Sequence, residues 1–349
     1  MKFSELTTMR VGGSIADAIE ATTATEAKEA YERLIRSDEE FVVLGGGSNT
    51  VASDEGYSGS ALLMRTRGIE TRSDDDGAVT LRVQAGEDWD SLVAVAVDNG
   101  WSGIEAMSGI PGSVGAAPIQ NIGAYGQELA SVLVAIDFFD AETLQTRRLE
   151  RDELGLAYRY SKIKGRELRG LVLAVELRLA ESPESQPIAY EQLAGALDAE
   201  LGDRRPLTEV REAVLQLRAS KGMVLSEDPD SVSAGSFFTN PIVSTKFARD
   251  FPESAPRFAA DPVTLDSGER VETVKLSAAW LIENAGIGRG FSLGHSRAAI
   301  SSKHTLAITN TGGATGEEIA ELARFVQARV ENAFGVYLVN EPVLVALEL

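Results

Sequence analysis

The sequence predicts a mixed fold of helices and strands with more than one domain. Two patterns alternate along the chain: apolar residues spaced three or four apart, typical of the buried side of a helix, and short apolar runs typical of strands. The chain has 349 residues, enough for two or three domains with real cores. Its apolar fraction of 44% and charged fraction of 25% are those of an ordinary globular protein.

The elements follow in a mixed order. Thr25 is the expected N-cap of a first helix over 25–40. Glycine follows three of the predicted helices directly, as expected of the residue that ends a helix. Further helices are predicted over 89–99, 208–219, 275–285 and 316–334, and strands over 41–44, 61–64, 79–84, 132–138, 171–179 and 306–309. Residues 336–349 are strand-like, and the polar segment 220–233 is a candidate domain boundary.

Composition excludes several classes of function. The formal net charge of −20 argues against nonspecific nucleic-acid binding and against an anionic membrane surface, because both need basic patches. The chain has no cysteine and only two histidines, which argues against iron–sulfur, thiolate-zinc and histidine-rich metal sites. The start has no apolar core of signal-peptide length, so the cytoplasm is the expected location.

The segment 110–126, I-P-G-S-V-G-A-A-P-I-Q-N-I-G-A-Y-G, has four glycines, two prolines and no charge. It is too rich in helix and strand breakers for one regular element, and too apolar for a solvated linker. It predicts a cradle in which glycines let backbone N–H groups approach a ligand, while Gln120 and Asn121 supply polar groups and Tyr125 a flat face. A buried structural crossover is the alternative interpretation.

The segment 44–50, L-G-G-G-S-N-T, follows a predicted strand. A strand that enters a glycine-rich turn brings backbone N–H groups to phosphates in many folds. The spacing matches neither the dinucleotide-binding G-x-G-x-x-G pattern nor a P-loop. A plain tight turn is an equally good interpretation of this segment.

Three further segments carry chemistry. Arg159, in the cation–aromatic run 158–162, is suited to clamp a carboxylate or phosphate, although an edge strand is the alternative. Ser236 lies between a glycine and two phenylalanines, and Glu341 interrupts the apolar C-terminal run. Residues 290–294 match the hydrolase pattern G-x-S-x-G with His295 beside them, but the strand before and the helix after that this motif requires are not predicted.

Together these segments resemble the UDP-N-acetylenolpyruvoylglucosamine reductase (MurB) family, flavoenzymes of peptidoglycan precursor synthesis. Five motifs in family order carry the resemblance: 44–49, 110–126, 158–161, 234–241 and 275–282. The segment Ile188-Ala189-Tyr190 resembles the longer subtype, whose extra loop folds over the substrate. Residues 338–342 read L-V-N-E-P where the family usually has L-E-x-E-V, so Pro342 removes a strand hydrogen bond beside Glu341.

The resemblance implies an α+β fold: a two-subdomain FAD-binding part of the vanillyl-alcohol-oxidase (PCMH) type and a C-terminal α+β substrate domain. The implied ranges are 1–218 for the FAD-binding domain, with a subdomain boundary near 66, 219–334 for the substrate domain, and 335–349 for a return to the FAD-binding part. The resemblance implies noncovalent FAD and no metal. The implied FAD-binding residues are Leu44, Gly45, Gly46, Gly47, Ser48, Asn49, Ile110, Pro111, Gly112, Ser113, Gly115, Ala116, Gln120, Asn121, Gly123, Ala124, Tyr125 and Gly126.

The resemblance also implies a reaction in two halves. NADPH reduces FAD and leaves, and UDP-N-acetylenolpyruvoylglucosamine then takes hydride from FAD and becomes UDP-N-acetylmuramate. Arg159 matches the cation that stabilises charge on the substrate carboxylate. Ser236 matches the residue that protonates C2, and Glu341 matches a carboxylate that acts with Arg159. The residues that match positions holding the UDP part or its diphosphate are Tyr190, Lys221 and Asn240.

The strong acidity is unhelpful for an anionic substrate, so a local positive field is expected around Arg159, Lys162, Lys164, Arg218 and Lys221. Two other functions remain open: a flavin oxidoreductase of the same fold with another substrate, and a noncatalytic nucleotide-binding module. The expected protein is a monomer with roles in cell-wall synthesis, cell shape, the cell cycle and cell division.

Overall fold

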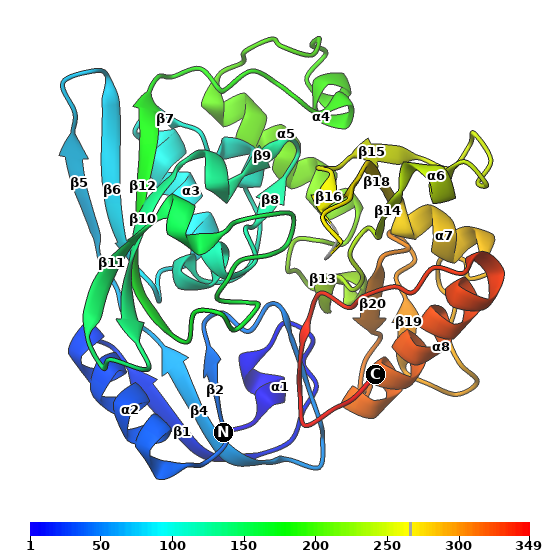
Figure 1. Ribbon diagram of the computed structural model, residues 1–349, viewed down its shortest axis with the longest axis horizontal. Coiled ribbons are helices and arrows are strands. Elements are labelled where there is room, and N and C mark those ends of the chain that lie inside the picture. Colours follow the sequence, from blue (N-terminus) through cyan, green and yellow to red (C-terminus); the bar gives the residue numbers. More distant parts are fainter. Residues whose placement is uncertain (265–266) are drawn as a thin grey trace. The chain divides into compact units, whose positions relative to one another are not determined.

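The computed structural model describes residues 1–264 and 267–349, which form two compact units (Figure 1). The first unit contains residues 1, 14–48 and 57–225, and the second contains 2–13, 49–56 and 226–349. The ranges predicted from the sequence divide the chain differently, because the C-terminal residues belong to the second unit. There β21 (Val343–Val345) pairs in parallel with β3 (Thr50–Ala52).

The first unit begins with a parallel sheet of order β1-β4-β2, formed by β1 (Ile15–Ala21), β4 (Tyr57–Met64) and β2 (Phe41–Leu44). Helix α2 (Ala24–Ser37) connects β1 to β2 and packs on β1 and β4. The N-cap is Thr23 and not the predicted Thr25, because Thr23 and Glu26 form a reciprocal capping box. The predicted strand β2 is present, but of its four residues only Leu44 is buried.

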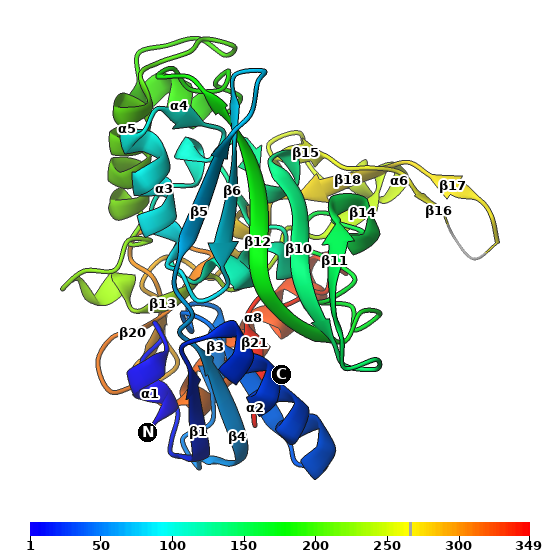
Figure 2. The ribbon, with the colours of Figure 1, turned by 90° about the vertical axis from the view of Figure 1, so that its left-hand side faces the viewer.

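The second sheet of the first unit is antiparallel, and its strands lie side by side in the order β11-β10-β12-β6-β5 (Figure 2). Its members are β5 (Ile69–Ser73), β6 (Ala78–Gln84), β10 (Leu133–Asp140), β11 (Thr146–Glu150) and β12 (Gly170–Glu181), with β7 (Trp101–Ser102) paired to β12. The chain passes from the first sheet to the second between Met64, the last residue of β4, and Ile69, the first residue of β5. Leu81, Ile136 and Val175 belong to the unit's hydrophobic core.

Three helices accompany the second sheet: α3 (Trp89–Asp98), α4 (Glu191–Ala196) and α5 (Leu207–Ser220). Helix α5 contacts both α3 and α4. The predicted glycine loop is partly regular, since it contains a 3₁₀ helix, η2 (Val114–Ile119), and the first strand of the hairpin β8 (Gly123–Ala124) and β9 (Gln127–Glu128). The remaining 3₁₀ helices of the unit are η1 (Glu105–Met107), η3 (Leu129–Ser131) and η4 (Arg151–Leu154).

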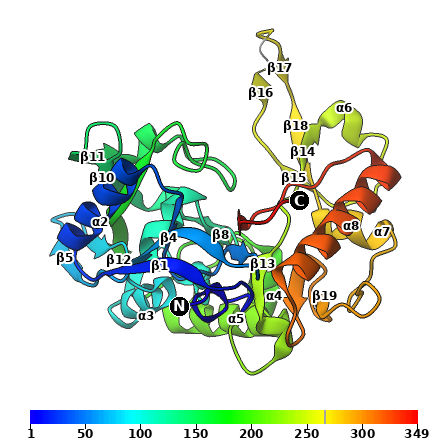
Figure 3. The same cartoon turned by 90° about the horizontal axis from the view of Figure 1, so that it is seen from below.

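The second unit has short strands and one long helix. Its strands are β13 (Ser233–Ser236), β20 (Ala307–Asn310) and β19 (Ala298–Ile300) in one sheet, β14 (Ile242–Ser244), β18 (Thr273–Leu276) and β15 (Arg257–Ala259) in another, and the pair β16 (Val263–Thr264) and β17 (Arg270–Val271). Its helices are α1 (Phe3–Leu6), α6 (Thr245–Ala248), α7 (Ala278–Asn284), α8 (Gly316–Phe334) and the 3₁₀ helix η5 (Pro229–Ser231). Helix α8 packs against α7 and β19 (Figure 3).

Two predicted elements of this unit illustrate how local sequence sets a boundary. Helix α8 covers the predicted residues, between the capping box of Thr315 and the left-handed Gly335. The helix predicted from Lys275 begins only at Ala278, because β18 runs to Leu276 and the Ser277 hydroxyl caps the backbone N–H of Trp280. Of the strand-like C-terminal run, only residues 343–345 form a strand.

The serine-hydrolase motif has no nucleophile elbow. Residues 290–294 follow helix α7 and precede strand β19, which is the reverse of the required strand–turn–helix order. The rejection of this motif is therefore confirmed. In the described part of the chain, no helix combines the length and apolar character needed to cross a membrane.

Candidate active site

The two glycine-rich segments of the first unit pack against each other, backbone to backbone. A Cβ atom added to Gly46 would lie 2.7 Å from Gly112 Cα, and one added to Gly45 would lie 2.0 Å from Ser113 Oγ. The Ser48 hydroxyl donates to the carbonyl of Pro111 at 2.8 Å. Only glycine permits this approach, so Gly45 and Gly46 let the two predicted cradle segments lie directly against each other.

Parts of the predicted cradle serve packing. The backbone N–H of Gly115 donates to the Ala85 carbonyl at 2.8 Å. An added Cβ at Gly115 would lie 2.5 Å from Ala85 Cβ. This N–H group is therefore engaged inside the protein and is not directed at a ligand, in contrast to the prediction. Arg65, which the sequence analysis did not single out, fixes the other segment by donating to the Gly45 carbonyl at 2.9 Å.

Three non-glycine residues near the cradle have left-handed backbones: Asn121 (φ 47°), Tyr125 (φ 46°) and Arg159 (φ 54°). Tyr125 and Gly126 form the two-residue turn between β8 and β9, and both have positive φ, as in the type I′ turn that favours Asn-Gly. An aromatic side chain in that position is strained, and such strain is concentrated at functional sites.

Arg159 is held against the glycine loop by its side chain. Its guanidinium donates to the carbonyls of Asn121, at 3.3 Å, and Gly123, at 2.9 Å. The Asn121 side chain is 2% exposed, donates to the Ala157 carbonyl at 3.2 Å and accepts from the Ala130 N–H at 3.0 Å. Asn121 therefore joins the two segments that carry Arg159 and its acceptors, and its amide group is occupied within the protein.

A second cluster of the unit surrounds Lys221, at the C-terminal end of α5. The Lys221 ammonium lies 5.3 Å from the centre of the Tyr125 ring and donates to Gln192 Oε1 at 2.7 Å. The Tyr190 ring meets the Tyr125 ring edge-on at 5.6 Å. Burial, and secondarily the charge of Arg218, lowers the pKa of Lys221 below its usual value. Gln192 was not predicted, and nothing in its sequence context marks it.

Arg218 is the most deeply buried cation of this region, at 8% exposure. Its Nη2 donates to the Met223 carbonyl at 3.1 Å, while Nε has no hydrogen-bond partner among the described residues. Burial lowers the pKa of Arg218 below its usual value. An unpartnered donor on a buried cation is costly, so this group is suited to an electron-rich ligand.

In the second unit, the structure brings the segments of Ser236 and Glu341 together. The Glu341 N–H donates to the Phe237 carbonyl at 2.8 Å, and Thr239 N–H donates to the Val339 carbonyl at 3.0 Å. Asn49 belongs to this unit and holds the Glu341 carbonyl with its side-chain amide at 3.1 Å. The Glu341 backbone is thus well anchored despite Pro342.

Ser236 ends strand β13, which pairs with β20. The preceding Gly235 is left-handed (φ 74°), and nothing lies within 4 Å of a Cβ added there. Gly235 therefore leaves free space beside the half-buried Ser236. Asn240 accepts from the backbone N–H of Ala278 at 2.9 Å, so its side-chain oxygen helps to cap helix α7.

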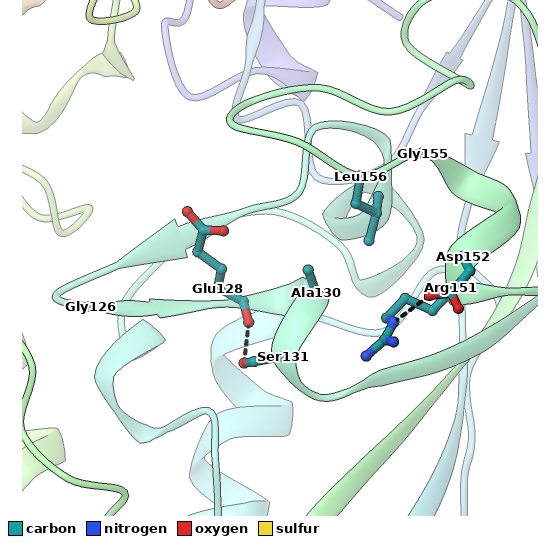
Figure 4. A pocket seen from close by; sticks show the side chains of 8 residues that line it. All are labelled: Gly126, Glu128, Ala130, Ser131, Arg151, Asp152, Gly155 and Leu156. Carbon is teal, nitrogen blue, oxygen red and sulfur yellow. Dashed lines mark hydrogen bonds and ion pairs between the residues drawn. The ribbon is translucent and has the colours of Figure 1, made fainter. Parts of the chain in front are cut away.

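A cavity of about 670 Å³ opens in the first unit beside the β8–β9 hairpin (Figure 4). Its lining residues are Gly126, Glu128, Ala130, Ser131, Arg151, Asp152, Gly155 and Leu156. Arg151 and Asp152 form an ion pair at 3.0 Å within it. None of the three predicted catalytic residues lines this cavity. Within residues 1–264 and 267–349, no group of three or more His, Asp or Glu side chains is arranged to hold a metal ion.

Comparisons with known proteins identify both halves of the chain. Residues 16–145 match the model of an FAD binding domain. Residues 228–345 match the model of the UDP-N-acetylenolpyruvoylglucosamine reductase C-terminal domain. The UDP-N-acetylenolpyruvoylglucosamine reductase of Leifsonia xyli is 52% identical, over 99% of this chain and 98% of its own length. That of Thermobifida fusca is 45% identical, over 99% and 97%.

A solved structure agrees with these matches. The crystal structure of UDP-N-acetylenolpyruvylglucosamine reductase (MurB) from Thermus caldophilus is 26% identical, with a TM-score of 0.62, and the alignment covers 99% of this chain and 97% of that chain. The predicted α+β fold class, with an FAD-binding part and a C-terminal domain, and the predicted FAD cofactor are confirmed. The chain belongs to the UDP-N-acetylenolpyruvoylglucosamine reductase family.

Proposed function

We propose that this chain reduces UDP-N-acetylenolpyruvoylglucosamine to UDP-N-acetylmuramate with NADPH, as a UDP-N-acetylmuramate dehydrogenase. The observation that carries the proposal is the combination of family membership with Arg159, held on a strained backbone against the glycine loop. FAD, when bound, accepts a hydride from NADPH and supplies a hydride to the substrate. The residues present fit this group, because the close-packed glycine segments are uncharged and the buried Arg218 Nε beside Gly109 has no hydrogen-bond partner among the described residues.

The cradle residues are proposed to bind FAD in two ways. The segments 45–48 and 111–113 are uncharged, and their backbone is close-packed, which suits a diphosphate held by N–H groups. Tyr125 has a raised pKa, chiefly because it is buried, so its ring offers a neutral face. Arg218 offers an unpartnered guanidinium Nε to an electron-rich atom of a ligand.

Arg159 and Ser236 have different proposed roles in the second half of the reaction. The substrate gains a hydride at C3 and a proton at C2, and negative charge builds up on its carboxylate between these events. The Arg159 guanidinium stabilises that charge. The Ser236 hydroxyl donates the proton to C2. Because serine is a weak acid, its oxygen must regain a proton from a neighbour or from water after each turnover.

Glu341 and the substrate-binding residues complete the proposal. The Glu341 carboxyl is proposed to act with Arg159 on the substrate carboxylate, as a protonated donor or polariser. Lys221 is proposed to bind the substrate diphosphate, to which lysine contributes a compact charge. Tyr190 and Asn240 are proposed to contact the UDP part. Tyr190 is 41% exposed, is the N-cap residue of α4, and its ring lies edge-on to that of Tyr125.

The cellular setting follows from this reaction. Its product is a precursor of peptidoglycan, so we propose roles in cell-wall synthesis and, through it, in cell shape, division and the cell cycle. The substrate is a cytoplasmic nucleotide sugar, which makes the cytoplasm the proposed location. We propose that the protein acts as a monomer.

Product analysis tests the function. The holoenzyme is incubated with NADPH and UDP-N-acetylenolpyruvoylglucosamine, and the nucleotide sugar is examined by mass spectrometry. The proposal predicts NADPH consumption that depends on this substrate and a product heavier by two hydrogen atoms. NADPH consumption without this product would favour a flavin oxidoreductase with another substrate. Binding of nucleotide without any NADPH consumption would favour a noncatalytic module.

A further inference from the structure

Arg159 lies at the second position of a tight two-residue turn. Ala157 and Tyr160 exchange both backbone hydrogen bonds, each at 3.1 Å, which leaves Tyr158 and Arg159 as the turn residues. A positive φ confined to the second turn residue is typical of a type II turn, where glycine is preferred. An arginine there needs surrounding contacts that keep its backbone in the left-handed region.

Lys164 supplies such a contact. Its ammonium donates to the Arg159 carbonyl oxygen at 3.0 Å. The carbonyl of a turn residue moves with the peptide plane that follows it, so a donor at that oxygen restrains the backbone rotation of Arg159. A charged donor makes this hydrogen bond stronger than a neutral one would.

The backbone of Lys164 is fixed in turn by Ser161. The Ser161 hydroxyl accepts from the Lys164 N–H at 3.2 Å and donates to the Ile119 carbonyl at 2.5 Å. Ser161 is fully buried. Lys164 is thus anchored on the same glycine loop whose carbonyls hold the Arg159 guanidinium. The glycine loop therefore restrains both parts of Arg159: the side chain directly, and the backbone through Ser161 and Lys164.

We propose that Lys164 is a positioning residue for Arg159. Its ammonium holds the left-handed backbone of Arg159 and thereby the direction in which the guanidinium faces the substrate carboxylate. The inference rests on the proposed function, in which Arg159 stabilises that carboxylate. Lys164 itself need not touch NADPH or the substrate. A lysine that bound a phosphate directly would show a different pattern of effects, and the experiment below separates the two.

The test measures the two half-reactions of the FAD-loaded enzyme separately by anaerobic stopped-flow absorbance. In K164M the rate constant for flavin reoxidation by the substrate is expected to fall about 10- to 100-fold, the scale of loss from a small misplacement of a catalytic group. The rate constant for flavin reduction by NADPH is expected to change less than about twofold, since no carboxylate charge develops there. K164R, which retains a charged donor, is expected to recover most of the loss.

Two comparisons make the result specific. K162M removes one positive charge from the segment that follows this turn. It is expected to cost at least about tenfold less than K164M, because Lys162 is half-buried against Gly155 and no described hydrogen bond joins its ammonium to Arg159. A cycle with R159M tests the route of action: K164M added to R159M is expected to cause no further loss, because Lys164 acts through Arg159. Flavin content and the thermal unfolding midpoint are recorded for each variant. The cycle remains informative when the unfolding midpoints differ, because it compares rate constants of the FAD-loaded proteins.

The inference would be overturned by equal losses in K164M and K162M, by full additivity of K164M and R159M, or by a K164M loss confined to NADPH binding. Failure of the proposed function would give a different result: UDP-N-acetylenolpyruvoylglucosamine would then not reoxidise the flavin of the wild-type enzyme.

Discussion

At the scale of single residues, the backbone conformation of Arg159 is a physical clue to function. A left-handed conformation costs an ordinary residue about 1–2 kcal/mol, and here three non-glycine residues near one loop adopt it. The side chains of Asn121 and Arg159 both bond to the backbone of the neighbouring segment. The fold therefore maintains strain where the segments 110–126 and 158–161 meet, which is the pattern expected of a functional site.

Two substitutions of Arg159 distinguish the cost of its left-handed backbone from the loss of its guanidinium group. R159G and R159A both lose the guanidinium, but only glycine tolerates the positive φ without cost. We expect R159G to be more stable than R159A by about 1 kcal/mol in free energy of unfolding, measured by urea denaturation. Both variants are expected to lose at least about 100-fold in the rate of flavin reoxidation by the substrate. Equal stability of the two variants would mean that the turn relaxes freely.

The lowered pKa of Lys221 predicts that substrate binding weakens at alkaline pH. Because burial and Arg218 lower the pKa of Lys221, it loses its charge at a lower pH than an exposed lysine does. The kcat/KM for the nucleotide sugar should therefore fall as pH rises through that lowered pKa. In K221R, whose guanidinium stays charged, the alkaline fall should move to higher pH. If kcat/KM fell at the same alkaline pH in the wild-type enzyme and in K221R, the fall would have to be assigned to a group other than Lys221.

At the scale of elements, the sequence predicted those whose boundaries are set locally. Helix α8 was predicted correctly because its cap at Thr315 and its stop at Gly335 are both in the sequence. The last two residues of β18, Lys275 and Leu276, fall in the helix predicted over 275–285, because the pairing of β18 with β14 and β15 is not visible in the sequence. Short strands such as β13 and β3 depend on distant partners in the same way.

The candidate site was predicted to a similar degree. The glycine segments and Arg159 were singled out from composition and motif, since a glycine-rich loop and a run of cations and aromatic residues are visible in a sequence. The supporting contacts were not. Gln192 reaches Lys221 across 29 positions, and Arg65 reaches the carbonyl of Gly45 across 20. Such pairs depend on the packing of separate elements and leave no local pattern.

The contact between the two glycine segments makes a sharp prediction. G46A places a methyl group against Gly112 backbone, where an atom would be only 2.7 Å away. We expect the segments to move apart and the affinity for FAD, measured by flavin fluorescence quenching on titration of the apoprotein, to fall about 10-fold or more. G195A is the matched control, because Gly195 lies in α4 with nothing within 4 Å of an added Cβ. An unchanged affinity in G46A would show that the contact does not shape the cradle.

At the scale of the whole molecule, the second unit is assembled from three separate pieces of chain. Met9, Val11 and Val51 come from the N-terminal pieces and are almost fully buried in its hydrophobic core. Strand β21 at the C-terminal end needs β3 as its partner. The family model of the C-terminal domain begins at residue 228, so its match describes only part of the folded unit.

Excision of the C-terminal piece tests this arrangement. A fragment of residues 226–349 lacks the buried side chains of Met9 and Val51, and deletion of even one such side chain costs about 2–5 kcal/mol. We expect the fragment to show no cooperative thermal unfolding by circular dichroism, whereas the full chain does. A fragment linked to residues 2–13 and 49–56 should regain cooperativity. Cooperative unfolding of the bare fragment would contradict the account of the core.

The most direct test of the proposed function is an anaerobic absorbance titration of the FAD-loaded protein. NADPH should bleach the flavin bands, and UDP-N-acetylenolpyruvoylglucosamine added afterwards should restore them in proportion to the amount added. Bleaching without recovery on addition of this substrate would contradict the assigned reaction while leaving a flavoprotein. A protein that stays colourless after FAD is supplied would contradict the cradle itself.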